Sequence, residues 1–277
     1  TFIVSVFVYK ITMKFDFFYE KNLKKFHTSK ALNIGGLIIS INILISIYLF
    51  QYPEEVNNYL IFTFLLFFLG FFDDIKEMSP TTRIFAQFFI IYFIINENQL
   101  DIKNLGSYEF IGIIELGVFS KIFTSLCVIM IINASNYNDG IDGWSNINFL
   151  ISNMFLIIVC IFFDNLDYIY IPIILMISSL VVLIFNFGIL NKVKIFLGNG
   201  GSLILGYLLA MEILYFEKIN IGIHSIIFAS ILCYHVFEFL AVNINRMYKK
   251  KNIFVGGKDH FHYAIYYYFS KKTHISL

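Results

Sequence analysis

Charged residues are scarce in this sequence. Asp, Glu, Lys and Arg together make up 14% of its 277 residues, whereas hydrophobic residues make up 58%. Soluble globular domains average about 25% charged residues, so the composition excludes an ordinary water-soluble fold. The formal net charge is only +1, which gives no electrostatic ground for a nucleic-acid or acidic partner.

Cysteine is scarce as well. Cys127, Cys160 and Cys233 each lie inside an apolar run, and no two of them have the CxxC spacing of a zinc or redox site. We interpret them as small buried or lipid-facing residues rather than as disulfides or metal ligands. The sequence also lacks a soluble domain or a long linker, so we expect one membrane-embedded domain over residues 1–277.

Long apolar runs are what the sequence has in abundance. A bilayer core about 30 Å thick needs roughly 20 apolar residues per helix, and these runs are apolar on every side, as in lipid-exposed helices. They predict an all-α fold, a polytopic membrane helical bundle with about nine transmembrane helices. The candidate spans lie near residues 1–13, 34–50, 59–72, 82–95, 118–134, 147–163, 168–187, 201–216 and 221–242.

We expect this bundle to be truncated at both ends. The first residue is Thr1 and an apolar run is already under way from Phe2 to Tyr9, so the chain is expected to begin inside a helix. Near the other end, residues 264–269 are apolar but too few to cross a bilayer.

Alternating the spans across a bilayer puts most basic residues on one side. The opposite side keeps Lys103 and Lys218 but carries most of the acidic loop residues. Because Lys and Arg bias short loops toward the cytoplasm, we expect the basic side to be cytoplasmic and the protein to lie in the cytoplasmic (inner) membrane. The basic side holds Lys14, Lys21, Lys24, Lys25, Lys30, Lys76, Arg83, Lys192, Lys194, Arg246, Lys249, Lys250, Lys251 and Lys258.

Two adjacent acidic residues, Asp73 and Asp74, end an apolar run on this basic side. They are followed by Ser79-Pro80, Arg83 and Gln87. Adjacent carboxylates repel each other and cost about 2.5 to 3.5 kcal/mol each at the centre of a bilayer. A bound cation, a proton or phosphate chemistry would explain the pair, and an ordinary acidic helix end would explain it equally well.

A second polar segment runs from Asn133 to Gly143. It holds two carboxylates, Asp139 and Asp142, together with several Asn and Gly residues. These side chains supply hard oxygen ligands, and the glycines allow close approach to a ligand. Asn, Asp and Gly also form ordinary turns, although a repeated Asp-Gly at this spacing is not typical of one.

A third segment, rich in glycine, runs through Gly198 to Ser202 and leads into a span. Backbone amides at a helix N-terminus suit a phosphate group. Membrane helices also use glycine for close packing, so this signal is weak alone.

Histidine and lysine mark the last two segments. His260 and His262 could bind metal or phosphate, or could be incidental loop histidines. Lys25 and His27 belong to a basic segment that binding to anionic lipid headgroups would explain. Neither segment indicates a function by itself.

In this order, the five segments resemble those of the polyprenyl-phosphate N-acetylhexosamine-1-phosphate transferases, the MraY/WecA-like membrane enzymes. The family pattern is a KxH segment before GG, then DDxxxLSP with a basic residue and Gln, then NxxNxxDGxDG, a GDxGS-type loop and HxHH. Each has a counterpart between residues 24 and 263. Single motifs are weak, whereas five in order on one membrane face are specific.

The resemblance implies a Mg-dependent glycosyl-1-phosphate transferase that begins a cell-envelope glycan. It would move a sugar 1-phosphate, such as N-acetylglucosamine 1-phosphate, from a UDP-N-acetylhexosamine to undecaprenyl or another polyprenyl phosphate in the bilayer, releasing UMP. Mg2+ would be the cofactor, with Mn2+ as an alternative, and a homodimer is left open. By analogy the catalytic residues would be Asp73, Asp74 and Asp139, and the metal ligands Asp139, Asn136 and Asn199. The substrates would contact Asn133, Asn136, Asp142, Arg83, His27, Lys25, His260, His262, Gly198 and Ser202.

The sequence departs from the family pattern at three places. Asn199 stands where the family usually has an Asp that binds Mg2+, and an amide oxygen is a neutral and weaker ligand than a carboxylate. Tyr263 replaces the last His of HxHH, and the usual Pro before GG is missing from residues 31–33. The His spacing favours the WecA-like branch, and the family would continue with further spans beyond the His segment.

Three other functions stay open on the sequence. The chain could be a phospho-N-acetylmuramoyl-pentapeptide transferase of peptidoglycan synthesis, the other branch of the same family. It could be an inactive homologue that binds polyprenyl phosphate, because Asn199 weakens the metal site. A transporter would need polar residues deep inside several spans, whereas here they cluster at loop ends and no internal repeat is evident.

Overall fold

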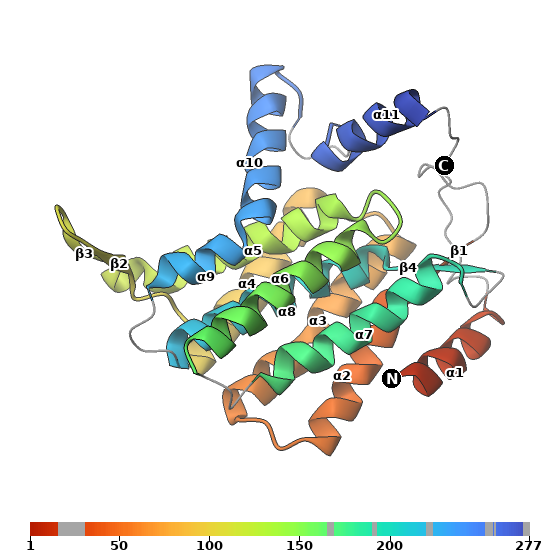
Figure 1. The fold of residues 1–277 in the computed structure, drawn as a ribbon, viewed down its shortest axis with the longest axis horizontal. Helices are drawn as coiled ribbons and strands as arrows, with labels where there is room; N and C mark the ends of the chain where they lie inside the picture. The colour runs from red at the N-terminus through yellow and green to blue at the C-terminus, as the bar shows by residue number, and fades with distance from the viewer. Residues whose placement is uncertain are drawn as a thin grey trace.

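The computed structural model describes residues 1–15, 31–164, 169–189, 193–219, 224–252, 257 and 259–273, and most of this chain is helical (Figure 1). The helices are α1 (Phe2–Thr12), α2 (Gly35–Leu49), α3 (Glu54–Ile75), α4 (Pro80–Asn98), η2 (Gly117–Phe119), α5 (Ser120–Asn138), α6 (Trp144–Phe162), α7 (Tyr170–Asn186), α8 (Gly198–Ile219), α9 (Ser225–Ile231), α10 (Cys233–Tyr248) and α11 (Phe261–Thr273). Every apolar run expected to span overlaps at least one of them.

Fewer helices than expected are both long enough and apolar enough to cross a bilayer. In the described parts of the chain, the long apolar helices are Glu54–Ile75, Gly117–Asn138 and Trp144–Phe162. The run 221–242 is not one straight span, because α9 and α10 meet at an angle of 66° and count at most as one bent span. α1, α2 and α7 are apolar but shorter. The structure therefore supports three to four membrane-capable helices and does not confirm nine spans.

Helix α8 forms the centre of the bundle. Its side chains from Gly200 to Phe216 are buried, and it packs against α2, α3, α5 and α6. A helix that is apolar on all sides is stable where other helices surround it. Helices α3, α4 and α6 instead expose large side chains such as Phe68, Phe89 and Phe155, as expected of surfaces that contact lipid.

Glycines let three helices converge at the start of α8. A Cβ atom added to Gly36 of α2 would lie 2.5 Å from the backbone nitrogen of Gly201, and one added to Gly70 of α3 would lie 2.5 Å from the Cα of Gly200. No larger side chain fits such a contact between backbones. The glycines in the third polar segment therefore serve close packing, one of the two interpretations given above.

Two short sheets make the all-α expectation incomplete. Strand β1 (Ala31–Asn33) pairs in parallel with β4 (Lys194–Phe196), and β2 (Asn104–Tyr108) forms an antiparallel hairpin with β3 (Gly112–Glu115). Strands of three to five residues are too short to show a clear alternating pattern. The β1–β4 pair joins the segment before α2 to the segment before α8, and the hairpin projects from the bundle beside α9 (Figure 1).

Helix α10 packs against α5 and rises from the bundle, and α11 follows it (Figure 1). The 66° bend between α9 and α10 sets this direction. The bend therefore brings the end of α10 and the histidine segment next to the polar end of α5.

Candidate active site

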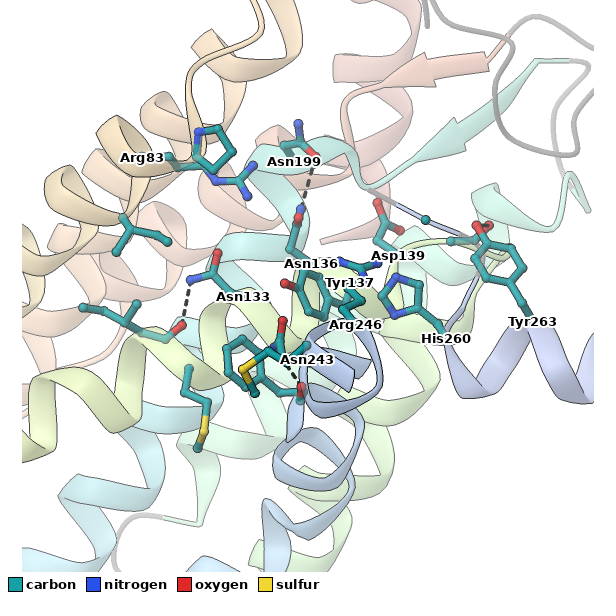
Figure 2. Close-up of a pocket in the computed structure, with 18 of the residues that line it drawn as sticks. Arg83, Asn133, Asn136, Tyr137, Asp139, Asn199, Asn243, Arg246, His260 and Tyr263 are labelled. Carbon is teal, nitrogen blue, oxygen red and sulfur yellow. Dashed lines mark hydrogen bonds between the residues drawn. The ribbon is translucent and has the colours of Figure 1, made fainter. Parts of the chain in front are cut away.

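A pocket of about 640 Å³ lies where α4, α5, α8 and α10 meet (Figure 2). This volume is within the range of small-molecule sites, about 300 to 1,000 Å³. Its polar lining residues are Arg83, Asn133, Asn136, Tyr137, Asp139, Asn199, Asn243, Arg246, His260 and Tyr263. Figure 2 shows Arg83 on one side of the pocket and Asp139 with His260 on the other.

The pocket is polar at one end and apolar along its helices. On α5, Leu126, Ile129 and Met130 precede Asn133 and Asn136 at helical spacing, and all of them line the pocket. Residues three and four apart share one face of a helix, so this face changes from apolar to polar toward the end of α5. α10 contributes the apolar side chains of Phe239 and Met247, one on each side of Asn243 and Arg246 in the sequence.

Asp73 is buried just behind the pocket wall, at 6% exposure. Its Oδ1 accepts a hydrogen bond from the backbone of Met78 at 2.8 Å, and its Oδ2 accepts from Arg83 Nη1 at 2.9 Å and from Asn199 Nδ2 at 3.0 Å. Ser79 caps α4 by accepting a hydrogen bond from the Thr82 backbone at 3.1 Å, and this cap places Arg83 beside the carboxylate. Asp73 thus joins α3, α4 and α8.

Asp74 binds the N-terminus of α8. The backbone N–H of Asn199 donates to Asp74 Oδ1 at 3.1 Å and Oδ2 at 2.9 Å, a favourable place for a carboxylate because of the helix dipole. Gly198 has φ +69°, and a Cβ there would lie 2.7 Å from Asp74 Oδ2. The amide that could have bound substrate phosphate in this loop therefore binds a side chain of the protein.

The asparagines of α5 connect this helix to α4 and α8 at the pocket wall. Asn133 Nδ2 donates to Gln87 Oε1 of α4 at 2.8 Å. Asn136 Nδ2 donates to Asn199 Oδ1 at 3.1 Å and to Ser202 Oγ at 2.8 Å. These contacts fix the end of α5 against both α4 and α8.

The two Asp-Gly carboxylates have different surroundings. Asp139 follows α5 and lines the pocket. Asp142 does not line it and instead accepts a hydrogen bond from Lys194 Nζ at 2.8 Å. Asp139 is therefore the acid of this segment that faces the pocket.

Two acidic side chains hold the histidine segment against α10. Arg246 Nη2 lies 2.7 Å from Asp259 Oδ1, and Glu238 Oε1 accepts a hydrogen bond from the Phe261 backbone at 3.0 Å. The hydrogen bond from Arg246 lowers the pKa of Asp259 to about 2, so this carboxylate is ionised at neutral pH. The segment is tied to α10 by a charge pair and a helix cap.

His260 lines the pocket, whereas His262 is fully buried behind it. Their rings are stacked, with centroids 5.4 Å apart, and Glu238 Oε1 lies 3.3 Å from His260 Nδ1. Burial, together with nearby His260, lowers the pKa of His262 to about 4. His262 is therefore neutral at pH 7, and of the pair only His260 lines the pocket.

The structure brings most of the predicted site residues together. Arg83, Asn133, Asn136, Asp139, Asn199 and His260 line the pocket. Asp73, Asp74, Gly198 and Ser202 lie behind the wall and connect to it through Asn199 or Asn136, while Asp142 and His262 lie outside the lining. Lys25 and His27 fall outside the described residues.

Sequence reasoning missed Tyr137, Asn243 and the role of Arg246 in the pocket. Arg246 was visible only as part of a basic run. Its spacing of three residues from Asn243 was a usable signal, because it places both on one face of a helix. Arg246 also lies over the Tyr137 ring, 5.7 Å from its centroid.

The pocket wall offers oxygen donors rather than a preformed metal cluster. Among the described residues, no group of three or more His, Cys, Asp and Glu side chains could hold a metal ion. Asp139 supplies a carboxylate, and Asn136 and Asn199 supply amide oxygens. Mg2+ commonly takes one or two carboxylates together with substrate phosphates and water. This donor set fits a Mg2+ ion that also binds phosphate oxygens.

Known proteins are similar to this chain over the same polar segments. The family model of glycosyl transferase family 4 matches residues 56–217, from α3 to α8. The phospho-N-acetylmuramoyl-pentapeptide-transferase of Streptococcus pneumoniae (strain CGSP14) is 26% identical over 267 residues, covering 87% of this chain and 76% of its own length. The undecaprenyl-phosphate alpha-N-acetylglucosaminyl 1-phosphate transferase of Salmonella typhi is 25% identical over 274 residues, covering 94% and 73%.

The matched region carries the acids of α3, which lie behind the pocket wall, and the asparagines of α5 and of the start of α8, which line the pocket. It covers more than half of the 277 residues. The chain belongs to glycosyl transferase family 4.

Proposed function

We propose that this protein transfers N-acetylhexosamine 1-phosphate from a UDP-sugar to a polyprenyl phosphate and releases UMP, the first membrane step of a cell-envelope glycan. One observation carries the proposal: a single pocket brings arginines and oxygen-rich side chains next to apolar side chains of α5 and α10. A polar nucleotide sugar and a lipid with a phosphate head need both surfaces next to each other. The name of the Salmonella typhi relative gives undecaprenyl phosphate and an N-acetylglucosaminyl 1-phosphate group.

Charge at the pocket wall suits two phosphate-bearing substrates. Arg83 and Arg246 line the pocket, each also paired with a carboxylate, Asp73 or Asp259, and a guanidinium group carries five N–H donors in a geometry that suits phosphate oxygens. His260 lies on the opposite side from Arg83 (Figure 2). In this proposal these side chains donate hydrogen bonds to the oxygens of a diphosphate and of an acceptor phosphate held in the same pocket.

The reaction is one displacement at phosphorus. An oxygen of the acceptor phosphate attacks the phosphorus attached to the sugar, and the bond from that phosphorus to the bridging oxygen breaks, so that UMP leaves with that oxygen. A phosphate monoester has a second pKa near 6, so the acceptor needs no strong base at neutral pH. Asp139 contacts the reacting groups, while Asp73 and Asp74 position Arg83 and Asn199.

A Mg2+ ion, or Mn2+ in its place, would be held by Asp139, the amide oxygens of Asn136 and Asn199 and the substrate phosphates. It would supply neutralisation of the diphosphate charge.

The proposal includes a membrane location. The described helices α1 to α8 and the bent pair α9–α10 are proposed to cross the inner membrane, with the pocket and the basic loops on the cytoplasmic side. Nucleotide sugars are soluble, so a site at that surface can be reached by both substrates.

UMP release tests this function. Purified protein is incubated with UDP-N-acetylglucosamine, with undecaprenyl phosphate present or withheld, and UMP is measured. We expect release that requires the lipid and that falls at least about 100-fold in Asp139→Asn, while Glu115→Gln on the hairpin releases UMP at the original rate. UMP release without lipid, or full activity in Asp139→Asn, would contradict the proposal.

The second candidate is a phospho-N-acetylmuramoyl-pentapeptide transferase, which the name of the Streptococcus pneumoniae relative favours. The same assay with UDP-N-acetylmuramoyl-pentapeptide separates the two. Turnover of that donor and not of UDP-N-acetylglucosamine would select the second candidate. Lipid binding without turnover of several UDP-sugars would select the inactive homologue.

A further inference from the structure

Asn199 occupies a central place in the hydrogen bonds of the pocket. Its Nδ2 donates to Asp73 of α3, its Oδ1 accepts from Asn136 of α5, and its backbone N–H donates to Asp74. Because an ionised carboxylate can only accept, the nitrogen of the amide must face Asp73 and the oxygen must face Asn136. One neutral residue thus cross-links three helices at the start of α8.

Each oxygen of Asp73 already faces donors. Met78 donates to Oδ1, and Arg83 and Asn199 donate to Oδ2. A carboxylate in place of the Asn199 amide would put negative oxygen about 3 Å from Oδ2, an arrangement that needs a cation or a proton between the two acids. The amide needs neither, so hydrogen bonds and the Arg83–Asp73 ion pair hold the loops of this site together without a bound metal ion.

We propose that Asn199 is a positioning residue that assembles this site without a divalent cation, so that a cation binds only together with a diphosphate ligand. The inference rests on the proposed function for the nature of that ligand. Asp139 is the carboxylate at the pocket wall, and a single carboxylate with two neutral amides is a weak cation site until phosphate oxygens complete it. Cation binding is therefore coupled to binding of the diphosphate.

Equilibrium dialysis of Mn2+ against the detergent-solubilised full chain tests whether cation binding depends on diphosphate binding. UDP is the diphosphate probe, and a chamber with UDP but no protein is the blank. Wild-type protein is expected to retain Mn2+ above the blank only when UDP is present. In Asn199→Asp, Mn2+ without UDP is expected to bind at least about tenfold more tightly than in wild type, because a second carboxylate faces Asp73.

Asn243→Asp is the matched control. It adds the same charge to the same pocket from α10, where the Asn243 side chain bonds to the Phe239 carbonyl rather than to Asp73. We expect it to leave Mn2+ binding without UDP as weak as in wild type. An equal gain in both variants would contradict a specific role for position 199.

Thermal unfolding gives a second measurement that does not depend on activity. The melting temperature of the wild-type chain should be the same with EDTA and with Mg2+, whereas that of Asn199→Asp should rise when Mg2+ is added. Saturable Mn2+ binding by wild type without UDP would overturn the inference and leave the transferase proposal standing. Failure to bind UDP at all would overturn the proposed function, and the inference with it.

Discussion

At the scale of single residues, the buried carboxylate of Asp73 is stabilised by the groups that donate hydrogen bonds to it. Arg83 provides one of these hydrogen bonds and forms an ion pair with Asp73. The Arg83 side chain is 18% exposed and the Asp73 side chain 6% exposed. Removing one partner of such a pair leaves a charge poorly solvated.

Arg83→Gln should therefore lower the free energy of unfolding by about 3 kcal/mol, measured by thermal unfolding in detergent. Lys76→Gln, at an exposed position close by in the chain, should change it little. In the double variant Arg83→Gln with Asp73→Asn much of the loss should be recovered, because no buried charge remains. A double variant as unstable as the single one would show that the ion pair is not the cause.

Protonation of His262 is the second prediction at this scale. Burial lowers its pKa from 6.5 to about 4, so between these values the unfolded chain binds a proton that the folded chain does not. Stability is then full above about pH 6.5 and falls as the pH drops toward 4.

The melting temperature should show this slope in wild type and lose much of it in His262→Asn. Asp259→Asn provides the contrast, because the pKa of Asp259 is lowered from 3.8 to about 2 and its contribution is lost only below about pH 4. An unchanged slope in His262→Asn would contradict the assignment.

The sequence singled out several residues that line this pocket, but it could not predict the hydrogen bonds between them. Asn133, Asn136, Asp139 and His260 were predicted to contact substrates or metal, because polar residues next to apolar runs are costly without a role. The structure places all four in the pocket lining, and their roles stay predictions. Asn199 was expected as a metal ligand, an assignment that stays a prediction. Only coordinates could show that its amide nitrogen faces Asp73.

At the scale of elements, glycine contacts control how closely α2, α3 and α8 approach. Gly70→Ala should lower the free energy of unfolding by about 2 kcal/mol, because the new methyl group meets the Gly200 backbone and α8 must shift. Leu65→Ala, at an exposed position on the same helix, is the control and should cost less. Equal stability of Gly70→Ala and wild type would contradict this packing.

Apolar runs predicted the helices well because each run must be shielded from water along its whole length. The bend at Leu232 was not predicted, since the run 221–242 has no proline or glycine that marks a break near that point. The bend has a large effect on the site, because it turns α10 and brings Asn243 and Arg246 to the pocket. The β1–β4 pair was missed because its strands are three residues long.

At the scale of the whole molecule, one acidic residue lies in the centre of the bundle. Glu212 of α8 is fully buried, and neither carboxyl oxygen has a hydrogen-bond partner of normal geometry among the described residues, although Asn153 of α6 is close enough to interact. The Asn153 side-chain oxygen also lacks a partner there. A glutamine at position 212 could donate to that oxygen.

Glu212→Gln should therefore raise the free energy of unfolding by about 1 kcal/mol. Glu217→Gln on the same helix is the control, because Glu217 is only partly buried and accepts a hydrogen bond from Ser225 that an amide oxygen can also accept. The two variants are compared by thermal unfolding in the same detergent. A loss of stability in Glu212→Gln would mean that the carboxyl group has a partner that these contacts do not show.

The central claim is that one pocket moves a sugar phosphate from a nucleotide to a lipid. The most direct measurement uses UDP-N-acetylglucosamine labelled at the phosphorus attached to the sugar, incubated with the purified protein and undecaprenyl phosphate and then extracted with organic solvent. The account predicts labelled phosphate in the lipid fraction and an equal amount of unlabelled UMP in water. Label that stays in water, as intact nucleotide sugar or as free sugar phosphate, would contradict it.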